Sequence, residues 1–157
     1  MIFQKGYNHL YKYITTEKLV WKKQVTIKTK ATPEQVWKLW SDVDNWNSWD
    51  TQTEYSSLNG DFEVGTELII KPAGGPKSKC KLIEVSPKKS FTVLGSLPLT
   101  KMYFIHELEK KGSETSITHS VEMKGPLTFM FSRIIGKNME EELKEAMDNL
   151  SKMAENS

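Results

Sequence analysis

The chain has 157 residues, of which 38% are hydrophobic and 27% are charged. This composition excludes a disordered chain and is typical of one globular domain. The 22 basic and 20 acidic residues leave a net charge of only +2, so we expect no nucleic-acid partner.

The first predicted elements are a strand and two short helices. Residues 19–30 alternate between apolar and polar side chains, which is the period of a half-buried strand. Thr32, Pro33 and Gln35 then have the spacing of a capping box with proline at the first helical position. A helix is expected from there to Trp40, and a second short helix over residues 46–49.

Short strands and one long helix are predicted for the rest of the chain. Turn residues separate strands over 51–58, around 68–70, and over 79–85, 90–94, 101–108 and 115–123, which favours an antiparallel meander. Gly125 and Pro126 end the last strand. Apolar residues at every third or fourth position then predict a continuous helix over residues 127–154 that packs on the sheet.

Two segments resemble a known superfamily. Residues 31–37 (ATPEQVW) resemble the junction between the first strand and the first helix of START-like, or SRPBCC, proteins, and residues 42–50 (DVDNWNSWD) resemble their second helix. This superfamily includes polyketide cyclase/dehydrase-like and Bet v 1-like proteins. The resemblance implies an α+β helix-grip fold, in which a curved antiparallel sheet of about seven strands wraps around a long C-terminal helix and encloses a cavity. We expect residues 19–157 to form this domain and residues 1–18 to be an N-terminal extension.

His106 and His119 are the most informative polar residues of the predicted sheet. If Leu108 lies opposite Thr115, then Ile117 lies opposite His106, and the two histidines are diagonal neighbours about 7 to 8 Å apart. The alternation of apolar residues places both on the concave surface. Three interpretations stay open: two histidines with water, tyrosine or backbone partners, a polar anchor for a ligand, or an acid/base pair.

Other candidate site residues have simpler interpretations. A metal site made of His106, His119 and Cys80 lacks the spacing of known metal motifs, so we expect no metal and no cofactor. The tryptophans of the short helices are expected to pack those helices onto the sheet rather than to stack on an aromatic ligand. Trp49, at the end of the second helix, is the one that suits both roles.

Targeting and crosslinking signals are missing from the sequence. No segment approaches the ~20 apolar residues of a membrane span, so we expect no stable membrane insertion. The first 18 residues lack the apolar core of a secretory signal, and the single cysteine excludes an internal disulfide. We therefore expect a cytoplasmic protein that is a monomer or a weak homodimer.

The leading functional hypothesis is a protein that binds a small apolar or aromatic molecule in the cavity. The expected ligand-binding residues come from both sides of that cavity: Trp49, Leu68, Ile70, Phe104, His106, Ile117, His119, Phe131 and Ile135. A second hypothesis is a polyketide cyclase or dehydratase-like enzyme with His106 or His119 as acid or base, although the lack of nucleophile motifs favours a binding protein. A third is an interaction module of the co-chaperone type with a filled cavity.

Overall fold

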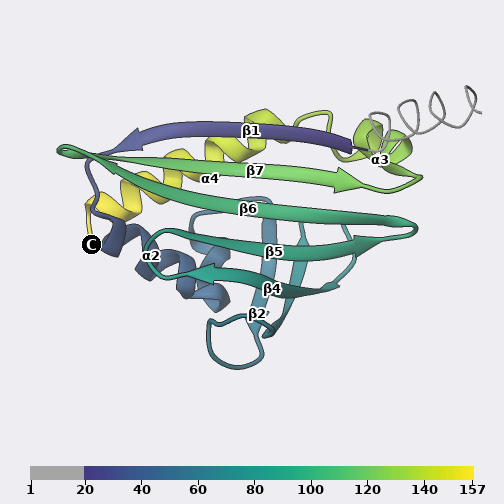
Figure 1. The fold of residues 1–157 in the computed structure, drawn as a ribbon, viewed down its shortest axis with the longest axis horizontal. Helices are drawn as coiled ribbons and strands as arrows, with labels where there is room; N and C mark the ends of the chain where they lie inside the picture. Colours follow the sequence, from purple (N-terminus) through teal and green to yellow (C-terminus); the bar gives the residue numbers. More distant parts are fainter. Residues whose placement is uncertain (1–19) are drawn as a thin grey trace, which may run out of the picture.

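Seven antiparallel strands form one curved sheet in the order β1-β7-β6-β5-β4-β3-β2 (Figure 1). The computed structural model describes residues 20–157, so the predicted extension over residues 1–18 lies outside the described residues. The strands are β1 (Val20–Thr29), β2 (Thr53–Leu58), β3 (Glu67–Pro72), β4 (Ser78–Ser86), β5 (Ser90–Leu97), β6 (Thr100–Lys111) and β7 (Glu114–Lys124). The helices are α2 (Pro33–Ser41), the 3-10 helix η1 (Val43–Ser48), α3 (Thr128–Ile134) and α4 (Met139–Glu155).

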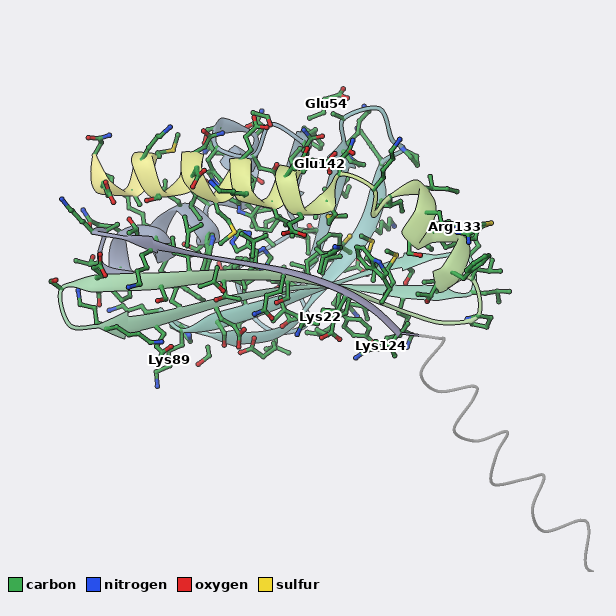
Figure 2. The ribbon with its side chains drawn as sticks, turned by 90° about the horizontal axis from the view of Figure 1, so that it is seen from above. Lys22, Glu54, Lys89, Lys124, Arg133 and Glu142 are labelled. Atoms are coloured by element: carbon green, nitrogen blue, oxygen red, sulfur yellow. The ribbon has the colours of Figure 1, made fainter. Side chains whose placement is uncertain are left out.

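The helix α4 lies along one face of the sheet, and α3 lies at one end of it (Figure 2). This arrangement confirms the predicted α+β architecture, with a curved sheet of seven antiparallel strands against a C-terminal helix. None of the helices within residues 20–157 is long and apolar enough to cross a bilayer.

The predicted capping box is present at the start of α2. The backbone N–H of Gln35 donates to Thr32 Oγ1 at 3.3 Å, and the backbone N–H of Thr32 donates to Gln35 Oε1 at 2.8 Å. The second predicted helix is the 3-10 helix η1, and the indole Nε1–H of Trp46 holds it against α2 by donating to the carbonyl of Trp40 at 2.9 Å. These contacts fix the two short helices as one unit over the sheet.

The register of the β6–β7 hairpin differs from the prediction. Leu108 lies opposite Ile117 instead of Thr115, and His106 lies directly opposite His119. The strands extend further than expected because Gly112, at a φ of 63°, allows a tight turn between Lys111 and Glu114. A shift by two residues keeps every side chain on its own face. The prediction that both histidines share the concave surface is therefore confirmed.

The predicted continuous helix over residues 127–154 is wrong. The chain leaves the helical path after Ile134 and resumes it at Met139. Gly136 is buried in this break, where an added Cβ would lie 2.5 Å from the indole of Trp21 and 2.4 Å from the carbonyl oxygen of Ser132. The backbone therefore approaches β1 closely at this point, which only glycine permits.

The core between the sheet and the helices contains two clusters of apolar side chains. In the first, around α2 and η1, side chains such as Trp40, Phe91 and Leu150 are fully buried. In the second, towards α3, Met123 is fully buried and Phe131 is only partly buried. The interior towards α3 therefore includes apolar side chains that are partly exposed.

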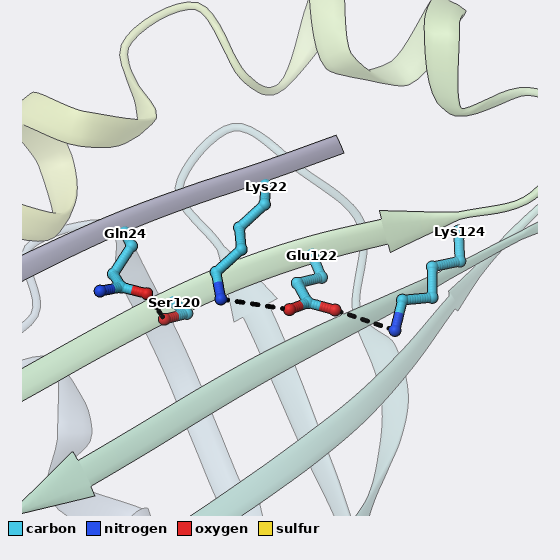
Figure 3. Close-up of polar contacts among 5 residues, drawn as sticks. All are labelled: Lys22, Gln24, Ser120, Glu122 and Lys124. Atoms are coloured by element: carbon cyan, nitrogen blue, oxygen red, sulfur yellow. Dashed lines mark hydrogen bonds and ion pairs between the residues drawn. The ribbon is translucent and has the colours of Figure 1, made fainter. Parts of the chain in front are cut away.

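The outer face of the sheet is polar. Glu122 accepts from Lys22 at 3.4 Å and from Lys124 at 2.9 Å, and Ser120 donates to Gln24 at 3.2 Å (Figure 3). The hydrogen bond from Lys124 holds the pKa of the Glu122 carboxyl below its usual range. This face has ordinary exposed ion pairs, so the candidate site lies on the opposite, concave face.

Candidate functional site

His106 and His119 form a cross-strand pair at the centre of the concave face. Their ring centroids lie 4.4 Å apart, with the ring planes at 73°. Phe91, which lies opposite His106 on β5, stacks flat on the His106 imidazole with a centroid distance of 4.0 Å. His119 is only 4% exposed. Neighbouring strands thus hold both imidazoles in fixed orientations.

Tryptophans from α2 and η1 enclose this pair on the side facing the helices. The Trp40 ring centroid lies 5.6 Å from each imidazole, and the Trp49 ring lies 6.3 Å from His119. Asn149 of α4 fixes the end of η1 by donating from Nδ2 to the carbonyl of Trp49 at 3.2 Å. The histidines therefore sit in a largely aromatic environment built from the sheet, both short helices and α4.

Four nitrogen atoms in this environment are buried and have no hydrogen-bond partner within residues 20–157: His106 Nδ1, His119 Nε2, Trp40 Nε1 and Trp49 Nε1. An unpaired buried polar group typically destabilises a protein by about 1 to 3 kcal/mol. The two indole N–H groups can only donate, whereas a neutral imidazole offers one donor and one acceptor. The cluster is therefore suited to a small polar group that can accept hydrogen bonds.

Burial keeps both histidines neutral. It lowers the pKa of His106 from 6.5 to about 3, against a smaller opposing effect of the backbone groups of Phe91 and Phe104. Burial also holds the pKa of His119 well below 6.5, and the neighbouring His106 adds to this effect. Near neutral pH neither histidine is an imidazolium cation that acts as a general acid, and each neutral imidazole is a weak base.

The predicted ligand-binding residues occupy two connected parts of the interior. Trp49, Leu68, Ile117 and His119 are buried, and His106 is partly buried with its Nδ1 enclosed. The other four predicted residues are only partly buried: Ile70 packs beside this buried group, and Phe104, Phe131 and Ile135 lie towards α3. Phe104 packs against both groups and connects them.

Two hollows of about 410 and about 400 Å³ lie on the surface, and neither is lined by any predicted ligand-binding residue. The first is lined by charged residues at the start of α4, and the second lies beside the β5–β6 turn. Around the imidazoles, the fully buried rings of Trp40 and Phe91 occupy the space in which we expected an open cavity.

Sequence reasoning missed Phe91 as a neighbour of the histidines and favoured a packing role for Trp40 over stacking on a ligand. Phe91 alternates with Val93 along β5, so its inward direction was readable from the sequence. That Phe91 lies opposite His106 on β6 was not readable from the sequence. Trp40 reaches the imidazoles from a helix that is distant in sequence, and no local pattern signals that contact.

Cys80 and the histidines do not come together as a metal site. Within the described part of the chain, no three His, Cys, Asp or Glu side chains are grouped as metal ligands. Burial raises the pKa of the Cys80 thiol to about 11. The cysteine therefore stays protonated and unreactive near neutral pH.

Several solved structures share this fold. The di-domain aromatase/cyclase StfQ from the steffimycin biosynthetic pathway superposes with a TM-score of 0.76 over 95% of this chain, at 8% sequence identity. This chain spans 56% of that di-domain protein. The ZhuI aromatase/cyclase from Streptomyces sp. R1128 has a TM-score of 0.72 and 11% identity, with 87% of this chain and 94% of that chain covered.

A norcoclaurine synthase point mutant from Thalictrum flavum, solved with a transition-state analogue, has a TM-score of 0.69 and 16% identity and covers 88% of this chain and 96% of that chain. At these identities the likeness shows the fold alone. A search among curated proteins found no match to this sequence.

A family model described as polyketide cyclase / dehydrase and lipid transport matches residues 20–155. This range includes the seven strands and the helices α2, η1, α3 and α4. The superfamily resemblance is confirmed by this match and by the helix-grip structures. The chain therefore belongs to the polyketide cyclase / dehydrase and lipid transport family.

Proposed function

We propose that this protein binds a small apolar or aromatic molecule that carries a hydroxyl or carbonyl oxygen, between the sheet and the C-terminal helices. The observation that carries the proposal is the cluster of four buried, unpaired nitrogen atoms among aromatic rings. Ligand pockets typically combine apolar walls with a few polar groups that orient the ligand. A ligand oxygen would give the indole N–H groups the acceptor they lack.

Partly buried side chains towards α3 supply the apolar part of the proposed site. Phe104 lies two residues from His106 on the same face of β6, about 7 Å away along the strand. Phe131 and Ile135 face this region from α3 and the segment after it, and both are only partly buried. A ligand entering at the α3 end would place its apolar body near Phe104 and its oxygen near the histidines.

Polyketide cyclase-like catalysis by His106 or His119 is the second candidate, and the two aromatase/cyclase structures with the same fold favour it. The electrostatics weigh against it, because a pKa of about 3 leaves His106 a poor proton acceptor near neutral pH. If turnover of a polyketide-like substrate is found, His106→Ala and His119→Ala should each lower it by about 10². Unchanged turnover in both variants would remove the histidines from the reaction.

Native mass spectrometry of the freshly purified protein, followed by solvent extraction, tests for a retained molecule and identifies its chemical class. Matched titrations with 2-naphthol and naphthalene then test the polar cluster. His119→Leu should weaken 2-naphthol binding by about 2- to 12-fold, the worth of one neutral hydrogen bond, and leave naphthalene binding nearly unchanged. Thr118→Val, on the outer face next in sequence, serves as the control.

Loss of both ligands in equal measure would contradict a polar anchor. Binding of neither ligand, with no retained molecule, would favour the third hypothesis of an interaction module whose interior is filled by its own side chains. A cytoplasmic location and a monomeric or weakly dimeric state stay predictions, and size-exclusion chromatography with light scattering measures the latter.

A further inference from the structure

The short helix α3 exposes apolar side chains on two adjoining sides. Phe129 is 62% exposed, Met130 41% and Ile134 69%. Successive helical residues are 100° apart, so Met130 and Ile134, four residues apart, lie on the same side of α3, and Phe129 points about 100° away from Met130. A helix that is apolar on several sides is normally buried. In this chain, α3 instead lies at one end of the molecule, beside the end of β7 (Figure 1).

Leu99 adds a fourth exposed apolar side chain at the same end. It is 71% exposed at the tip of the turn between β5 and β6. This turn packs directly against the segment that leads into α3, because a Cβ at Gly125 would lie 2.2 Å from the Leu99 carbonyl oxygen. We call Leu99, Phe129, Met130 and Ile134 together the α3 surface.

The backbone of Leu99 is in an unfavourable conformation for its side chain. Its φ is 52°, in the left-handed region, and the turn consists of Pro98 and Leu99 between the paired residues Leu97 and Thr100. Glycine or asparagine is the usual residue at such a position. The fold thus places a strained leucine where little of its side chain is buried, so its presence is not explained by packing.

The two chain segments that form the α3 surface and its edges are basic, and the nearest carboxylates in sequence are Glu107, Glu122 and Glu140 just outside them. Glu140 lies beside Lys137 at the start of α4. Residues 91–106 and 123–139 contain no Asp or Glu, but they include Lys101, Lys124, Arg133 and Lys137. Lys124 pairs with Glu122. Within residues 20–157, Lys101, Arg133 and Lys137 have no ion-pair partner.

Arg133 lies directly over an exposed aromatic ring, with its guanidinium carbon 4.1 Å from the centroid of Phe129. The small net charge of +2 for the whole chain conceals this local excess of positive charge. Positive and apolar groups therefore occur side by side on the α3 surface and at its edge.

We propose that the α3 surface docks on an anionic lipid bilayer, with its apolar side chains at the level of the headgroups and the unpaired cations on lipid phosphates. Protruding apolar groups combined with nearby Lys and Arg are the features that bind proteins peripherally to anionic membranes. The charge disfavours coverage by the first 19 residues, which contain three lysines and one glutamate and so have the same sign. This proposal does not depend on the ligand-binding proposal.

Flotation of the full chain with lipid vesicles tests the proposal. The protein should float with vesicles of phosphatidylcholine containing about one third phosphatidylserine, and much less with phosphatidylcholine alone. Raising the NaCl concentration from about 0.05 to about 0.5 M should lower binding at least about fivefold, because salt screens the cations. Equal binding to both vesicle types, or no binding to either, would overturn the proposal.

Leu99→Gly separates docking from folding. Glycine relaxes the left-handed backbone, so the urea midpoint should be unchanged or higher, while vesicle binding should fall about fivefold or more with the loss of one inserted side chain. Val64→Ser is the matched control, because Val64 is 60% exposed on the loop between β2 and β3, away from α3 in Figure 1. Equal vesicle binding by Leu99→Gly and the unmodified protein would contradict the proposed contact.

An environment-sensitive dye attached to a Phe129→Cys variant, in a Cys80→Ala background, distinguishes the alternative partners of this surface. The dye should report water in the free protein and shift to the blue when anionic vesicles are added. A dye that is already blue-shifted and does not respond to vesicles would refute membrane docking. In that case a monomer by light scattering would indicate coverage by residues 1–19, and a dimer would indicate a second copy of the chain.

Discussion

Acidification should destabilise the protein through its two buried histidines. Burial lowers the pKa of His106 from 6.5 to about 3 and holds that of His119 well below 6.5. In the unfolded chain the pKa of both histidines returns to its ordinary value of about 6.5. Between about pH 6.5 and 3, the unfolded chain therefore binds protons that the native protein does not. The free energy of unfolding is fully retained above this range and falls as the pH decreases through it.

The magnitude follows from the size of these pKa shifts. Each histidine that stays neutral in the native state removes about 1.4 kcal/mol of stability per pH unit below the unfolded pKa. From about pH 7.5 to about pH 4.5, His106 lowers the free energy of unfolding by about 3 kcal/mol, and His119 adds to this loss. A change of this size is a large fraction of the stability of a typical domain.

Urea unfolding followed by tryptophan fluorescence at several pH values measures this dependence. The double variant His106→Gln/His119→Gln keeps polar side chains at both positions but cannot titrate, so its stability should depend much less on pH. The raised pKa values of Asp50 and Glu142 act in the opposite direction, and they are present in both proteins. Equal pH slopes for the variant and the unmodified protein would refute the assignment of two buried, neutral histidines.

Three further predictions concern the fold. Thr32→Ala removes one hydrogen bond of the capping box and should lower the free energy of unfolding by about 1 kcal/mol, as measured in urea; an unchanged midpoint would show that α2 does not need its cap. Gly136→Ala places a methyl group 2.5 Å from the Trp21 indole and should lower the free energy of unfolding in urea by about 1 to 3 kcal/mol. An unchanged free energy of unfolding would contradict the close approach of Gly136 to Trp21. The Cys80 thiol, whose pKa is raised to about 11, should react slowly with a disulfide reagent near about pH 8 and rapidly in urea; fast reaction in the native protein would contradict its burial.

Local patterns predicted much of the architecture. The capping box at Thr32 and Gln35 depends on a few neighbouring residues, so the sequence was sufficient to locate the start of α2. The alternation along β6 and β7 likewise placed His106 and His119 on the concave face, because successive side chains of a strand point to opposite sides. Both predictions required no knowledge of what lies across the fold.

The break between α3 and α4 illustrates what local patterns leave out. The apolar spacing continues through residues 127–154, and a single glycine inside such a pattern is compatible with an unbroken helix. The interruption at Gly136 is associated with close packing against Trp21 on β1, at the other end of the described chain. The spacing of apolar residues within one helical segment contains no information about that contact.

The sequence by itself determined the order of the elements and the face on which each side chain lies, because both follow from backbone geometry over a few residues. Only the tertiary structure decided that His106 lies directly opposite His119, since register depends on the tight turn at Gly112. It also decided that Trp40 and Trp49 close over the imidazoles, with polar atoms left unpaired. These contacts join segments that meet only when the whole sheet has curved around the helices.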